Sequence, residues 1–158
     1  MSKSICAGRM TAQMDQNFVV FLIGMRVNRV SAIGQWWPVT MAMPRMLREL
    51  YAQKELGFLG GEMWFGRTTI ALQYWRSYGQ LEAYARMKDR EHLPAWAEFN
   101  RRVAKTGAVG VWHETYLSGP GQYENVYSNM PAFGLGGVGT LVEATGKRER
   151  AGDRLRGG

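Results

Sequence analysis

Apolar residues along this chain fall into short blocks with two different periods. Residues 17–28 (NFVVFLIGMRVN) are apolar at both odd and even positions and are rich in β-branched and aromatic side chains. This pattern predicts a strand that is covered on both faces. A single sheet backed by helices would leave one face open, so we expect a second sheet, which a partner subunit could supply, to cover the other face.

The next blocks predict a helix and a hairpin. After a turn that contains Gly34, residues 39–51 have helical spacing with Arg45 and Arg48 off the apolar stripe. The apolar positions of this stripe are Val39, Met43, Met46, Leu47, Leu50 and Tyr51. Residues 63–65 and 68–75 then predict two strands that turn near Gly66.

The following blocks complete the pattern. Ser77 and Gln80 have the spacing of a capping box, which predicts the start of a helix through Leu81 and Tyr84. A second helical stretch, ending near Gly107, has Leu93, Trp96, Ala97, Asn100 and Val103 at compatible spacing. Residues 108–117 alternate like a strand. The order strand, helix, strand, strand, helix, strand predicts an α+β fold of the ferredoxin-like, split β-α-β kind.

Composition and charge divide the chain into three parts. We expect residues 1–16 to be an irregular arm, 17–145 to be the ferredoxin-like domain and 146–158 to be a basic, disordered tail. The formal net charge is +7, but much of it lies in this tail. Because the other basic residues are interleaved with acidic ones, we expect no nucleic-acid partner.

The N-terminus and the single cysteine bear on location. Cys6 is the only cysteine, so no intramolecular disulfide can form. The longest apolar run, residues 18–25, is too short to span a bilayer, and the N-terminus lacks the order of a signal peptide. We therefore expect a cytoplasmic protein without a membrane partner.

A glycine-rich stretch at residues 133–139 (FGLGGVG) invites comparison with phosphate-binding loops. It lacks the GxxxxGK[ST] pattern, and no clear strand leads directly into it. The residues after it, 140–143, fit a short strand as well as they fit a helix. A lid or a segment that crosses between subunits is the interpretation we favour.

Several segments carry a family resemblance. They are FVVFLIGMRVN, WWPV followed by MPRMLREL, FGRTTIALQYWRS, LPAWAEFNRRV, GVWHETY and YSNMPAFGLG, which together span most of residues 17–136. In these segments the chain resembles the small monooxygenase-related proteins allied to the antibiotic-biosynthesis monooxygenases. The resemblance implies a dimeric α+β barrel, in which two sheets meet face to face and each subunit retains a pocket between sheet and helices.

The same resemblance implies a function. It indicates a monooxygenase-like oxidoreductase of secondary metabolism that acts on a hydrophobic aromatic or polyene small molecule, without flavin or metal. The architecture serves other purposes too, because a fold does not by itself fix chemistry. The alternatives are a haem-binding or non-catalytic ligand-binding dimeric module that uses the same pocket, and a purely structural dimer.

His113 is the candidate catalytic residue. It shares one face of the predicted strand with Val111 and Thr115. An imidazole there could remove an activated proton from an electron-rich substrate, and the resulting carbanion could react with dioxygen. It could equally be an axial haem ligand, or a hydrogen-bonded imidazole in the core or an interface. Glu114 points to the opposite face of a regular strand, so it cannot orient this imidazole within one subunit unless a bulge intervenes.

Candidate substrate-binding residues are of two kinds. Arg26, Asn28 and Arg76 lie at strand ends, where they could orient a carbonyl or carboxylate or pair with acidic groups across a dimer. The aromatic candidates, which could form an apolar wall or simply pack in the core, are Trp36, Trp37, Trp64, Tyr74 and Trp112. No metal-ligand cluster or flavin fingerprint is visible in the sequence.

Overall fold

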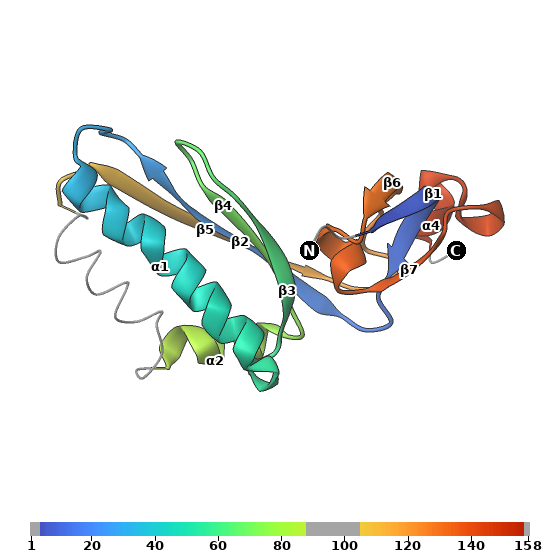
Figure 1. Cartoon of the computed structure of the whole chain (residues 1–158). Coiled ribbons are helices and arrows are strands. Elements are labelled where there is room, and N and C mark those ends of the chain that lie inside the picture. The colour runs from blue at the N-terminus through green and yellow to red at the C-terminus, as the bar shows by residue number, and fades with distance from the viewer. Residues whose placement is uncertain (1–3, 88–104, 157–158) are drawn as a thin grey trace.

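The chain folds around two antiparallel sheets that lie at opposite ends of the molecule (Figure 1). The computed structural model describes residues 4–87 and 105–156. The strands are β1 Ile5–Gln13, β2 Phe18–Val27, β3 Phe58–Trp64, β4 Ile70–Trp75, β5 Val109–Ser118, β6 Tyr127–Pro131 and β7 Thr140–Glu143. The α-helices are α1 Ile33–Ala52, α2 Tyr78–Arg86 and α4 Ala151–Leu155, and the 3-10 helices are η1 Lys54–Leu56, η2 Gly134–Gly137 and η3 Gly146–Arg148.

The larger sheet has the strand order β3-β4-β2-β5. All of its strand pairs are antiparallel. One of its two central strands, β2, is the apolar segment of the sequence analysis. Strands β3 and β4 form the predicted hairpin, but β3 begins at Phe58 rather than Met63 and β4 begins at Ile70 rather than Thr68. This order with α1 and α2 as crossovers is the ferredoxin-like arrangement, so the predicted α+β fold class is confirmed.

One face of the larger sheet packs on the helices. Trp75 is fully buried there, and Val19 from β2 is buried beside it. Leu50 from α1 and Tyr84 from α2 close the same core cluster. Because side chains alternate along a strand, the neighbours of these residues point to the other, outer face of the sheet.

Helix α1 begins earlier than the sequence pattern predicts. It starts at Ile33 rather than near Val39, and it contains Pro38 and Pro44. Proline lacks the N–H that the helix ladder uses, which is why the earlier residues read as a turn. The Thr40 hydroxyl donates to the Trp36 carbonyl at 3.0 Å and ties this first part of the helix together.

Helix α2 begins where the capping box predicts. The Ser77 hydroxyl accepts a hydrogen bond from the backbone N–H of Gln80 at 3.2 Å. This bond satisfies one of the free N–H groups of the first turn. The second predicted helical stretch, residues 93–107, falls largely outside the described residues.

The smaller sheet corrects the prediction for the N-terminus. Residues 5–13, expected to lie in an irregular arm, form β1 at the centre of a sheet with the order β6-β1-β7. The partners of β1 are strands more than a hundred residues further along the chain. Backbone pairing with such distant partners holds β1 in place, and the local pattern of small and polar residues gives no sign of it.

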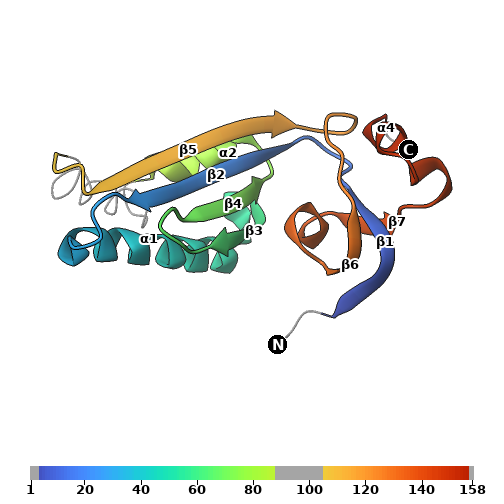
Figure 2. The same cartoon turned by 90° about the horizontal axis from the view of Figure 1, so that it is seen from above.

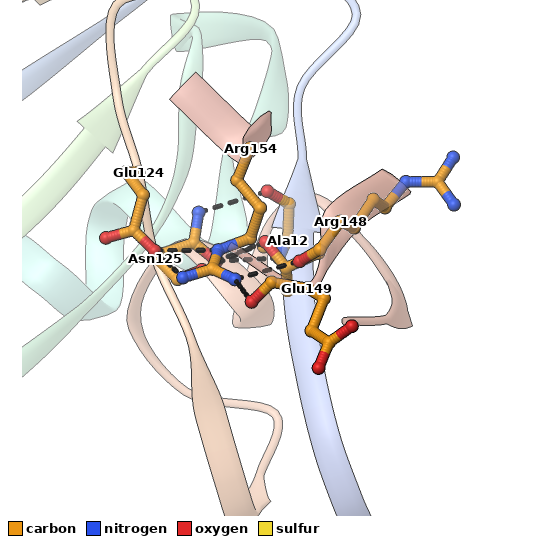
Figure 3. A network of polar contacts seen from close by, with 7 residues as sticks. Ala12, Glu124, Asn125, Arg148, Glu149 and Arg154 are labelled. Atoms are coloured by element: carbon orange, nitrogen blue, oxygen red, sulfur yellow. Dashed lines mark hydrogen bonds and ion pairs between the residues drawn. The ribbon is translucent and has the colours of Figure 1, made fainter. Parts of the chain in front are cut away.

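The C-terminal segment also differs from the expected disordered tail. It contains η3 and α4, and the side chain of Arg154 in α4 is only 5 % exposed. The Arg154 guanidinium donates to the Glu124 carboxylate and to the backbone carbonyls of Arg148 and Glu149 (Figure 3). A buried, fully engaged guanidinium orders a segment that has little apolar surface to bury.

A shared apolar core joins the two sheets. Phe18 and Tyr74 from the outer face of the larger sheet pack with Ala12 of β1 and Leu135 of η2. Figure 2 shows η2 and β6 facing the ends of β3 and β4. Tyr123 adds an edge contact to Phe18, with ring centroids 5.3 Å apart. The glycine-rich stretch is therefore packed against the core through Leu135.

Candidate functional site

His113 lies on the helix-facing side of β5. It is opposite Ile23 in the ladder between β5 and β2. Its ring centroid is 5.8 Å from that of Phe21, while the imidazole itself remains exposed. Glu114 points to the outer face, as expected, where its carboxylate accepts the Tyr116 hydroxyl at 2.6 Å. His113 thus combines an apolar neighbour with free access, which suits a proton-transfer group or a metal ligand.

A buried amide lies two strands away on the same face. Gln73 of β4 is only 4 % exposed and pairs across the sheet with Phe21. Its Oε1 accepts the indole N–H of Trp75 at 2.9 Å, and its Nε2 lies 3.8 Å from Met43 Sδ. The sequence analysis missed Gln73. The signal was a polar residue between Ala71 and Trp75 at a core-facing position of the strand.

Two of the predicted aromatic residues lie on α1. Trp36 packs against Met25 and Val109, and its indole N–H donates to the Val30 carbonyl at 3.0 Å. Trp37 is 54 % exposed, and its ring lies 6.0 Å from that of Trp36. Both lie on the same side of the larger sheet as His113, at the end of α1 near Met25.

The other predicted aromatic residues belong to the outer face. Trp112 lies against Gly24, and its buried indole N–H has no hydrogen-bond partner in the described part of the chain. Trp64 is 43 % exposed and contacts Phe133 with ring centroids 5.9 Å apart. The larger sheet therefore separates Trp64, Tyr74 and Trp112 from His113.

The predicted polar anchors lie at the sheet ends. Arg26 faces outward and donates to the Thr68 hydroxyl at 2.8 Å. The Asn28 amide donates to the Gly107 carbonyl at 3.1 Å. The Arg76 side chain is exposed just after β4. The structure does not bring these three side chains together with His113.

Two tyrosine hydroxyls meet at η2. The backbone N–H of Gly136 donates to the Tyr127 hydroxyl at 3.2 Å, and that of Leu135 donates to the Tyr74 hydroxyl. Burial, with smaller contributions from Tyr127 and Glu62, raises the pKa of Tyr74 to about 12. Burial also raises the pKa of Tyr127. Both phenols therefore stay protonated in the physiological range and hold the glycine-rich stretch in place.

A cavity of about 330 Å³ lies beside the smaller sheet. The Asn125 side chain lines the cavity and makes two hydrogen bonds to the backbone of β1, as a neighbouring strand would. Its amide oxygen accepts from the Ala12 N–H at 2.7 Å, and its amide nitrogen donates to the Ala12 carbonyl at 3.0 Å (Figure 3). The Thr11 hydroxyl donates to the Asn125 carbonyl. Glu124 and Arg154, which also line the cavity, neutralise one another. The cavity is lined from the smaller sheet and the C-terminal segment, whereas His113 lies on the helix-facing side of the larger one.

Two further properties concern residues 4–87 and 105–156 only. Within them no group of three or more His, Cys, Asp or Glu side chains could hold a metal ion. No helix among them has the length and apolar character needed to cross a membrane.

The family model described as monooxygenase af470-like matches residues 18–135, which include β2 to β6 and the start of η2. The chain belongs to this family. The family resemblance stated from the sequence is thereby confirmed. The matched span includes His113 and Gln73 and leaves out β1, β7 and α4.

Individual relatives of the family are distant. Monooxygenase af470 of Aspergillus fumigatus is 26% identical over 129 residues, which are 75% of this chain and 45% of that protein. The chain thus spans less than half the length of this curated relative.

The solved structures have lower sequence identity to this chain than monooxygenase af470 has. SnoaB, a cofactor-independent oxygenase from Streptomyces nogalater, has 12% identity and a TM-score of 0.45, covering 65% of this chain and 93% of that chain. A dimeric protein of unknown function with a ferredoxin-like fold from Bacteroides fragilis has 9% identity and a TM-score of 0.44, covering 63% of this chain and 96% of that chain.

Proposed function

We propose that this protein is a monooxygenase-like oxidoreductase that acts on a hydrophobic aromatic or polyene small molecule without flavin or metal. Membership of the af470-like family supports the reaction class. The observation that carries the proposal is His113, an exposed imidazole 5.8 Å from Phe21 on the helix-facing side of the sheet. This pair offers a proton acceptor next to an aromatic surface on which a flat substrate can stack.

The reaction needs two things from these residues. The apolar surface around Phe21 and Ile23 binds the substrate and excludes water, and His113 accepts a proton from a C–H or O–H group that the conjugated substrate has made acidic. The resulting anion adds dioxygen at a carbon that carries a further hydrogen, which gives a peroxide. The peroxide takes up a proton and loses water to leave a carbonyl group, so the substrate itself supplies the four electrons that reduce dioxygen.

The active form is proposed to be a homodimer. The outer face of the larger sheet has apolar, half-buried side chains in its middle, among them Val20, Leu22 and Leu72. Beside them Trp64 is 43 % exposed and Tyr116 is 51 % exposed. An apolar sheet face of this kind is stabilised when a second copy covers it.

Oxygen uptake tests the reaction. The native protein is mixed with hydroxylated naphthalenes and with conjugated polyenes in an oxygen electrode, and the His113→Ala and Glu114→Gln variants are compared. Glu114 is the matched control, because it is exposed and next to His113 in β5 but points to the opposite face of the sheet. We expect loss of at least a hundredfold in rate for His113→Ala, in line with removal of a general base, and near-native rates for Glu114→Gln.

Absorption spectra distinguish the haem-binding alternative from the cofactor-free oxygenase. The native protein and His113→Ala are each titrated with haemin. A Soret band that shifts or disappears in the variant would make His113 a haem ligand and would displace the cofactor-free oxygenase. Ligand-induced stabilisation without oxygen uptake across the whole panel would instead favour a non-catalytic binding module.

A further inference from the structure

Three segments meet at the end of the larger sheet that points away from the smaller sheet (Figure 1). They are residues 26–37, which end β2 and begin α1, residues 65–68 between β3 and β4, and residues 105–107 before β5. Four apolar side chains of this surface are each more than half exposed, namely Val30, Ile33, Trp37 and Phe65. Ile33 and Trp37 lie four residues apart and so share one face of α1. Single exposed apolar residues are normal, but a group of them at one place indicates a contact surface.

Hydrogen bonds hold the three segments side by side. The Arg67 guanidinium donates to the Val27 carbonyl at 3.1 Å, and the Val27 N–H donates to the Arg67 carbonyl at 2.8 Å. The Thr106 hydroxyl donates to Gln35 Oε1 at 2.7 Å. The surface is therefore a fixed part of the fold, and its apolar side chains stay exposed unless a partner covers them.

The same surface carries positive charge alone. Its three segments contain no aspartate or glutamate and four cations, which are Arg26, Arg29, Arg67 and Lys105. All four are exposed, and none forms an ion pair within the described residues. Arg86 and Arg156, by contrast, each pair with a nearby carboxylate on the surface. Unpaired cations beside exposed apolar groups favour an anionic partner.

This charge argues against a second copy of the chain as the partner at this surface. In a twofold-symmetric dimer, the same surface of the two subunits meets itself. Contact here would place the four cations of one subunit against the same four of the other, and like charges across an interface repel. The anionic lipids of a bilayer supply the opposite charge, and the headgroup region accepts the apolar side chains.

We propose that this end of the molecule docks on the surface of a bilayer that contains anionic lipids. Ile33, Trp37 and Phe65 enter the level of the headgroups, where the amphipathic ring of tryptophan is favoured. Arg29 and Lys105 contact the lipid phosphates. The expectation of no membrane partner came from the lack of a spanning segment, and a surface contact needs no span. This membrane contact goes beyond the proposed function and does not rest on it.

Vesicle co-sedimentation tests the docking. The full-length protein is mixed with vesicles of phosphatidylcholine alone, or of phosphatidylcholine with phosphatidylglycerol, and the bound fraction gives a partition coefficient. We expect about a hundredfold stronger binding to the anionic vesicles, because each of the four cations gains from their surface potential. High salt should weaken this binding, since it screens exposed charges. Equal or absent binding to the two kinds of vesicle would overturn the proposal.

Two double variants of equal net charge test which cations bind. Arg29→Gln with Lys105→Gln removes two cations from the docking surface. Arg9→Gln with Lys147→Gln removes two exposed cations from β1 and η3, at the other end of the molecule. We expect about a twentyfold loss of binding to anionic vesicles for the first pair and a much smaller loss for the second. Equal losses would indicate attraction by the total charge and would overturn the assigned surface.

A second pair of double variants tests the apolar contact. Ile33→Ser with Phe65→Ser should weaken binding to anionic vesicles about tenfold or more, because two apolar side chains no longer leave water. Ile5→Ser with Leu155→Ser is the control, since both residues are exposed at the other end of the molecule and should not matter. Circular dichroism checks the fold, and light scattering checks the oligomeric state.

Two results of this second comparison would overturn the proposal. Unchanged vesicle binding by the Ile33→Ser and Phe65→Ser double variant would show that these side chains do not enter the bilayer. A change in its oligomeric state with unchanged vesicle binding would assign the surface to contact between copies of this chain.

Discussion

The guanidinium of Arg154 and the carboxylate of Glu124 form an ion pair that joins α4 to the connection between β5 and β6. The same guanidinium donates to two carbonyls of its own segment, at 2.8 Å for Arg148 and 2.7 Å for Glu149. One side chain therefore organises the C-terminal segment and attaches it to the rest of the chain.

Arg154→Met should destabilise the smaller sheet. The substitution leaves the Glu124 carboxylate and two carbonyls without their donor, at a cost of about 1–3 kcal/mol because Glu124 keeps some access to water. Urea denaturation gives the change in free energy, and hydrogen exchange should speed up in residues 146–156. Arg156→Met is the control, since the Arg156 side chain is 76% exposed and its ion pair with Asp153 lies on the surface. Equal effects of the two substitutions would refute the role assigned to Arg154.

Gly24→Ala should destabilise the larger sheet. A Cβ at this position would lie 1.9 Å from the Thr69 carbonyl oxygen and 2.8 Å from Trp112 Nε1. Both the backbone of Thr69 and the indole of Trp112 must shift, at a cost of about 1–3 kcal/mol. Gly79→Ala in α2 provides the contrast, because no atom lies within 4 Å of its Cβ. Since alanine favours the helix, Gly79→Ala should raise the free energy of unfolding by about 0.5 kcal/mol.

Stability should fall at high pH through Tyr74. Its pKa is raised from 10.0 to about 12 in the folded protein, so the folded state holds this proton more tightly than the unfolded state does. The stabilisation is complete below pH 10 and is lost as pH rises from 10 towards 12. We expect a loss on the order of 1–2 kcal/mol, reduced from the full shift by screening. Denaturation of native protein and Tyr74→Phe across this window measures it. An equally steep decline in Tyr74→Phe would show that other groups cause the pH dependence.

Ser77→Ala should weaken the start of α2 by about 1 kcal/mol, because the Gln80 N–H loses its acceptor. Ser77→Asp restores an acceptor and should recover most of the loss. Thermal denaturation of the three proteins gives the comparison. A melting temperature for Ser77→Asp as low as that of Ser77→Ala would contradict the capping role.

Local patterns were sufficient to predict the strand order of the larger sheet and the helices α1 and α2, although not where α1 and β3 begin. The apolar run of β2, the helical stripe of α1 and the Ser77 cap each depend on residues near in sequence. Strand β1 could not be predicted in this way, because residues such as Cys6 and Gly8 form a strand only through partners at 127–131 and 140–143. Arg154 looked like one more charge in a basic tail, since Glu124 lies thirty residues before it.

The candidate site was predicted in part. The alternation of β5 placed His113 and Glu114 on opposite faces, as the structure has them. The aromatic candidates were chosen by residue type, and residue type does not say which side of a sheet a side chain faces. Gln73 escaped notice because the amide gains its meaning from Met43, which lies on α1 thirty residues earlier.

The position of β1 between β6 and β7 has a consequence for synthesis on the ribosome. Every strand of the larger sheet lies within residues 18–118, so that sheet can pair as soon as β5 has left the exit tunnel. Strand β1 emerges before the strands of the larger sheet but has no partner until residues 127–143 follow. Pairing over such a distance along the chain is slow. A strand that is made before the larger sheet therefore pairs after it, and until its partners are made it is an unpaired strand that a chaperone could bind.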